Sequence, residues 1–231
     1  MEINDEAKMQ EKYIEMLKDI IENIIGNIIG NNLELDLKGL EGIKIVNNLE
    51  NEGSGGRFEN NVILLPKYKI EEYIKDENFD TIKSTIYHEL CHVDLKSKFQ
   101  QLHVLSDEYR NNENYVRYFT IMVYIEYISH IMSLEYETEE NIKRFLNSIN
   151  NRTWNFNDEI SRIYFIKCAP YVLGRINNKF EYIDIIKSNE FKVHIVEVKE
   201  IIERIPNVNL IDDYNILIEL ENYVSKYISN D

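Results

Sequence analysis

Apolar residues recur every three or four positions in several long stretches, a spacing typical of helices with one buried face. The first stretch predicts a helix over residues 5–29 that ends near Gly26 or Gly30. Its apolar positions are Tyr13, Met16, Leu17, Ile20, Ile24 and Ile28. A second helix is predicted over residues 80–98, because neither Gly nor Pro interrupts it and Asp80 can cap its first turn. Its apolar positions are Ile82, Ile86, Leu90 and Val93.

A third uninterrupted stretch predicts a long helix over residues 113–134. Its buried stripe is expected to consist of Tyr115, Tyr118, Phe119, Met122, Ile125, Ser129 and Met132. The remaining chain is predicted to be helical as well, with a kink at Pro170 and a helix end before Pro206. The expected helices are residues 141–148, 158–175, 189–205 and 210–229, although residues 191–198 also fit a strand.

Two segments near the N-terminus are rich in β-branched residues and predict strands. Residues 42–46 form one, and residues 57–65 form another that a turn at residues 59–61 can split into a hairpin before Pro66. Residues 51–56 are Gly-rich and predict a loop, whereas residues 33–40 fit no single structure. The fold class is therefore α+β and mostly helical, with a core over residues 1–138 and a helical region over residues 139–231.

The composition of the chain excludes several classes of function. Hydrophobic residues make up 44% of the chain, enough for a packed core rather than a disordered chain. A net charge of −15 opposes broad binding to nucleic acid or to an anionic membrane. The two cysteines, Cys91 and Cys168, indicate no disulfide framework, and no secretion signal or membrane span is evident. We expect a cytoplasmic protein, and no sequence feature indicates its oligomeric state.

The main candidate for a functional site is the segment His88-Glu89-Leu90-Cys91-His92, which reads H-E-x-x-H. Residues four apart share a helix face, so His88 and His92 can bind one metal ion through their Nε2 atoms. Glu89 can then reach a water on that ion and act as a general base. The alternative is a pair of surface histidines on an ordinary amphipathic helix.

A catalytic zinc site takes three protein ligands and keeps one position for water. Leu95 and Lys98 exclude the class that has Gly and a third His at those positions, and His103 is a weak candidate. Glu126 is the preferred third ligand, because it borders the buried stripe of the third helix, where a carboxylate needs compensation. The alternative for Glu126 is an interfacial carboxylate paired with Arg117 or a lysine. Four further acidic residues are expected to be solvated: Glu135, Glu137, Glu139 and Glu140.

HExxH followed by Glu126-Tyr127-Ile128-Ser129 resembles the gluzincins, the zincin class with HExxH on one helix and a ligand Glu on a second. It is similar to the ImmA/IrrE-like peptidases of bacteria and prophages, in which E-x-x-A follows HExxH, with Ser129 here in place of Ala. The resemblance covers residues 40–135 and implies a zincin-like core with a small antiparallel sheet beside the HExxH helix. Larger gluzincins place an Asp one turn after the ligand Glu to orient a histidine, but this chain has His130 there, and Asp94 is another candidate.

The resemblance implies an intracellular, zinc-dependent peptidase that acts on a peptide or protein substrate. Zinc would be held by His88, His92 and Glu126, with Glu89 as the base. His130 and Tyr109 are guesses for the donor to the oxyanion. The strand at residues 62–65, or its Gly-rich loop, is expected to pair with an extended substrate. Two alternatives are a metal-binding regulatory protein without efficient hydrolysis, and a helical interaction protein whose HExxH is accidental.

Overall fold

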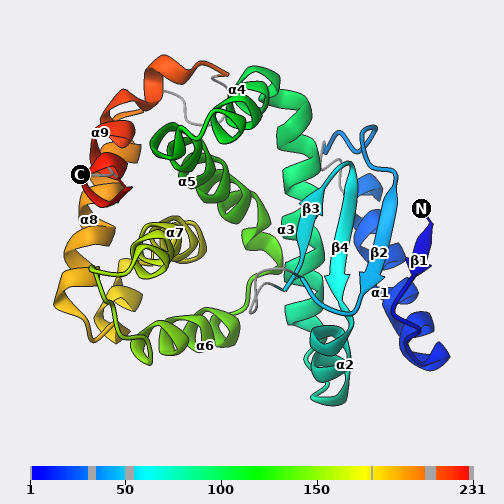
Figure 1. Ribbon diagram of the computed structural model, residues 1–231. Coiled ribbons are helices and arrows are strands. Elements are labelled where there is room, and N and C mark those ends of the chain that lie inside the picture. The colour runs from blue at the N-terminus through cyan, green and yellow to red at the C-terminus, as the bar shows by residue number, and fades with distance from the viewer. Residues whose placement is uncertain (1, 31–34, 50–54, 178, 206–211, 229–231) are drawn as a thin grey trace. The chain divides into compact units, whose positions relative to one another are not determined.

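The computed structural model describes residues 2–30, 35–49, 55–177, 179–205 and 212–228. Within these ranges the protein is a mostly helical α+β structure with a four-stranded mixed sheet near the N-terminus and nine α-helices (Figure 1). The chain packs as two compact units. The first comprises Met1–Ser97 with Glu135–Glu137, and the second comprises Lys98–Leu134 with Thr138–Asp231. The expected division into a core over residues 1–138 and a helical region over residues 139–231 stays a prediction.

The sheet belongs to the first unit and has the strand order β1-β2-β4-β3. Its strands are β1 (Ile3–Asp5), β2 (Gly42–Val46), β3 (Arg57–Glu59) and β4 (Val62–Pro66). β1 pairs with β2 and β2 with β4 in parallel, whereas only β3 and β4 are antiparallel. The predicted antiparallel sheet is therefore wrong. Long connections carry the chain back to the same end of the sheet before β2 and before β4, which makes those strands parallel.

The predicted hairpin within residues 57–65 is confirmed. Asn60 and Asn61 connect β3 to β4, with φ angles of 50° and 65°. A two-residue turn with both φ angles positive matches the twist of the flanking strands, and Asn tolerates this backbone region better than most residues. Of the predicted Gly-rich loop, residues 51–54 lie outside the described residues, and Gly55 and Gly56 directly precede β3.

Three helices complete the first unit: α1 (Glu11–Gly30), α2 (Lys67–Lys75) and α3 (Phe79–Lys98). The first helix begins six residues later than predicted, because β1 uses the preceding segment and the Asp5 carboxylate accepts a hydrogen bond from Met9 N at 2.6 Å. The predicted helix over residues 80–98 is confirmed as α3. Its cap is Asn78 rather than Asp80, since Asn78 Oδ1 accepts from Thr81 N at 3.3 Å.

The second unit contains six helices in its described part: α4 (Gln100–Asn111), α5 (Tyr115–Met132), α6 (Glu139–Asn150), α7 (Glu159–Ile176), α8 (Asn189–Arg204) and α9 (Ile218–Ile228). Short 3-10 turns cover Ser133–Tyr136, Phe180–Ile185 and Tyr214–Leu217. The predicted helices over residues 113–134, 141–148, 158–175 and 189–205 are confirmed, and the helix passes through Pro170. The strand alternative for residues 191–198 is wrong. No described helix is both long and apolar enough to cross a membrane.

Helix α4 could not be assigned from local patterns. α4 buries only Leu102 and Ser106, so its apolar stripe is weak. Its first turn is instead completed from 110 residues away, where the Asp212 carboxylate accepts from Gln101 N at 2.7 Å and from Leu102 N at 2.8 Å. This contact satisfies amide groups that a helix leaves open at its start.

His194 lies in the core of the second unit and is 1% exposed. Its Nε2 donates to Phe165 O at 3.1 Å, which leaves Nδ1 to accept a hydrogen bond from the Tyr223 hydroxyl. Burial lowers the pKa of His194 to about 3, so the ring is neutral at physiological pH. The prediction that His194 is a structural residue agrees with this position.

The crossing of α5 and α7 depends on a glycine. A Cβ atom added at Gly174 would lie 2.3 Å from His130 Cβ and 3.0 Å from Tyr127 O. Gly174→Ala should therefore lower the free energy of unfolding by about 1–3 kcal/mol, because the helices must separate. Urea titration measures the effect, and Gly26→Ala in α1 is the matched control, since nothing lies within 4 Å of its added Cβ. Equal effects of the two substitutions would contradict the close crossing.

Candidate metal centre

The two HExxH histidines converge within the first unit. His88 Nε2 and His92 Nε2 lie 3.1 Å apart, and their rings are nearly perpendicular, with an interplanar angle of 89°. A tetrahedral zinc ion with two Zn–N bonds of ordinary length separates its nitrogen ligands by about 3.3 Å. The pair therefore fits the donor set and spacing of one zinc ion.

Glu89 lies on the same helix and is only 6% exposed. Its side chain packs against the backbone just before β3: a Cβ added at Gly56 would lie 3.1 Å from Glu89 Cγ and 3.2 Å from Glu89 Oε1. Glu89 is therefore nearly buried on the helix that carries the histidine pair.

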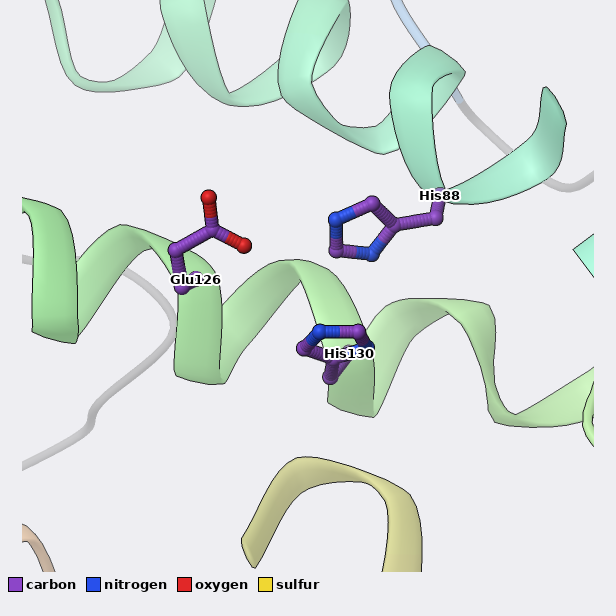
Figure 2. Close-up of side chains that lie close together, drawn as sticks. All are labelled: His88, Glu126 and His130. Carbon is purple, nitrogen blue, oxygen red and sulfur yellow. The ribbon is translucent and has the colours of Figure 1, made fainter. Parts of the chain in front are cut away.

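Glu126 and His130 lie on α5 in the second unit, four residues apart and hence on one face. Ser129 between them is fully buried and donates to Ile125 O at 3.0 Å. His88, Glu126 and His130 each offer one ligand atom, and these three atoms lie within 4.8 Å of one another (Figure 2). A His/Glu/His triad on helices that can bind a metal ion is thus present.

This triad contains two of the predicted site residues, His88 and Glu126. It includes His130, which the sequence suggested only as a donor to the oxyanion, and the signal that could have found it is the four-residue spacing from Glu126. His92 is not in the triad and lies beside His88 instead. The ligand role of His92 and the base role of Glu89 stay predictions.

The weaker candidates for a role at the metal site make hydrogen bonds to other residues. The Asp94 carboxylate is fully buried and accepts from Asp36 N at 2.8 Å, which ties the segment before β2 to α3. The Tyr109 hydroxyl accepts from Arg117 at 3.5 Å. Glu137, which was expected to be solvated, is half-buried and its carboxylate accepts a hydrogen bond from the Ser84 hydroxyl at 3.2 Å. Each of these groups has a structural contact that accounts for its position.

The expected role of β4 in pairing with a substrate strand is wrong. β4 lies between β2 and β3, so both of its edges already carry ladder hydrogen bonds. The sheet edges are β1 and β3, and β3 is the edge strand that directly follows Gly55 and Gly56. An added strand can pair only with an edge.

Comparison of the chain with protein-family models, with curated proteins and with solved structures gave no match. Any function assigned to the chain therefore depends on the geometry of these residues.

Proposed function

We propose that the protein is a zinc-dependent peptidase in which His88, His92 and Glu126 bind the metal and Glu89 is the general base. The observation that carries the proposal is the 3.1 Å approach of the two histidine Nε2 atoms on a helix that also holds a nearly buried Glu89. An HExxH sequence that folded as an accidental surface motif would have no reason to bury the glutamate, which is only 6% exposed here.

A bound zinc ion would supply a Lewis acid and lower the pKa of a coordinated water. Glu89 takes the proton from the attacking water and delivers it to the leaving amine. His88, His92 and Glu126 would hold the metal ion. His130, one turn beyond Glu126, is positioned as a hydrogen-bond donor to the oxygen that gains charge during attack.

Metal analysis and a peptide assay test this function together. The purified protein should contain one zinc ion per chain by mass spectrometry and should hydrolyse members of a proteome-derived peptide library. Removing the metal with 1,10-phenanthroline should abolish hydrolysis, and adding zinc should restore it, because the water is a poor nucleophile without the ion. Hydrolysis that survives complete metal removal would contradict the proposal.

A second function is favoured by the grouping of His130 with His88 and Glu126. Structural zinc sites have four protein ligands and no open position for water. If His88, His92, Glu126 and His130 all bound one ion, the protein would be a metal-binding regulatory or interaction protein without hydrolysis. Bound zinc with no cleaved peptide in the library would favour this alternative.

A further inference from the structure

The start of β3 approaches α3 more closely than side chains normally allow. A Cβ added at Gly56 would contact Glu89 Cγ at 3.1 Å, Glu89 Oε1 at 3.2 Å and Thr85 Cγ2 at 3.2 Å. A Cβ added at Gly55 would lie 3.2 Å from Thr85 Oγ1 and 3.3 Å from Thr85 Cγ2. The two glycines therefore lie against two successive turns of the helix, at Thr85 and at Glu89. All of these residues belong to the first unit.

We propose that Gly56 is a positioning residue for Glu89: its lack of a side chain lets the β3 backbone hold the Glu89 carboxylate in the orientation that faces the metal-bound water. This inference rests on the proposed function and adds a residue that the HExxH motif does not contain. Gly56 makes no contact with the reacting atoms in this scheme. It acts only through Glu89.

The Glu89 side chain is the part of this contact that can move. Thr85 and Glu89 are one turn apart on a long helix, so the helix backbone is held by its own hydrogen bonds. Gly56 is held by its connection to β3, which is paired along its whole length with β4. Between these two backbones the flexible part is the Glu89 side chain. A methyl group on Gly56 therefore displaces the carboxylate rather than the helix or the strand.

Thr85, one helix turn from Glu89, lies against the same glycine. Its methyl group is one of the three atoms nearest to the added Cβ of Gly56 and of Gly55. Replacing Thr85 with Ser removes that methyl group while keeping the hydroxyl. The Thr85→Ser change should give the new methyl of Gly56→Ala room beside residue 85, and so restore part of the lost function.

The test uses the full chain loaded with Co²⁺ and acetohydroxamate as the probe. A hydroxamate chelates the metal and donates its hydroxyl hydrogen to a carboxylate beside it, so its affinity reports the position of Glu89 without any turnover. The visible absorbance of Co²⁺ follows its binding. Gly56→Ala should weaken acetohydroxamate about 10–100-fold, the effect of losing one hydrogen bond to a charged group. Co²⁺ affinity should not change.

Gly39→Ala is the matched control, because Gly39 lies in an exposed turn with nothing within 4 Å of its added Cβ. It should leave acetohydroxamate affinity unchanged. Gly56→Ala added to Glu89→Gln should cause no further loss, because the residue through which it acts is already altered. If Gly56→Ala alone folds poorly, Gly56→Ala with Thr85→Ser is compared with Thr85→Ser alone, and a smaller but measurable loss is expected.

Three results would overturn the inference. Equal acetohydroxamate affinity in the wild type and Gly56→Ala would show that Glu89 keeps its place. Loss of Co²⁺ from Gly56→Ala would show that the glycine supports the ligands and not the base. A wild-type chain that binds no Co²⁺ would remove the proposed function itself, and with it this inference, so the two failures are distinguishable.

Discussion

Replacing Glu89 with Gln should lower turnover of a cleaved library peptide by about 10²–10⁴-fold, the range for loss of a general base. Zinc content should stay at one ion per chain, because Glu89 is not among the predicted ligands. The amide keeps the size of the carboxylate, so the packing against Gly56 is retained. The measurements are kcat by mass spectrometry of the cleaved peptide and zinc content of the same preparation.

Asp80→Asn is the matched control for this experiment. It makes the same chemical change in the first turn of the same helix, where the Asp80 side chain is 59% exposed. This substitution should leave kcat within about twofold, as expected of a surface position away from the chemistry. A Glu89→Gln variant with the activity of the wild type would contradict the role given to Glu89.

Replacing either HExxH histidine should remove the metal. His88→Ala and His92→Ala should each weaken zinc binding by more than about 100-fold, because even the outer partners of metal ligands are worth 10–100-fold. Glu126→Ala should have a comparable effect. Competition with a chromogenic chelator measures the affinity. His103→Ala on α4 is the control and should bind zinc as the wild type does.

His130→Ala distinguishes the two proposed functions. If His88, His92 and Glu126 are the ligands, His130→Ala should keep zinc affinity within about tenfold and lose turnover, since only a hydrogen-bond donor is removed. If the ion has four protein ligands, His130→Ala should weaken zinc binding as strongly as His92→Ala. Strong zinc binding by His92→Ala together with loss of zinc from His130→Ala would select the triad of His88, Glu126 and His130 instead.

The metal candidates differ in how far the sequence could identify them. His88 and His92 are four residues apart on a helix, so helix geometry alone brings their nitrogens close, and the 3.1 Å separation agrees. The grouping of His130 with His88 could not be predicted in this way. It joins residues 42 positions apart, and only tertiary packing decides such a distance.

The helices and strands also differ in how far the sequence could predict them. The periodicity of residues 80–98 and 113–134 was sufficient to predict α3 and α5, because a helix forms by hydrogen bonds between near neighbours along the chain. Two adjacent Asn residues were sufficient to predict the β3–β4 turn. The direction in which β1, β2 and β4 pair was not predictable from their own residues, since parallel pairing depends on how the intervening segments return the chain.

The sequence by itself determined the helices that carry HExxH and Glu126, the hairpin, and the helical character of the second half of the chain. Tertiary structure alone decided the mixed sheet, the completion of α4 by Asp212, and the close packing of Gly56 on Glu89. The physical reason is how far apart along the chain the contacting residues are. Helices and tight turns follow from contacts within a few residues, whereas a sheet order, a distant cap or the wall of a site depends on atoms that only the folded chain brings together.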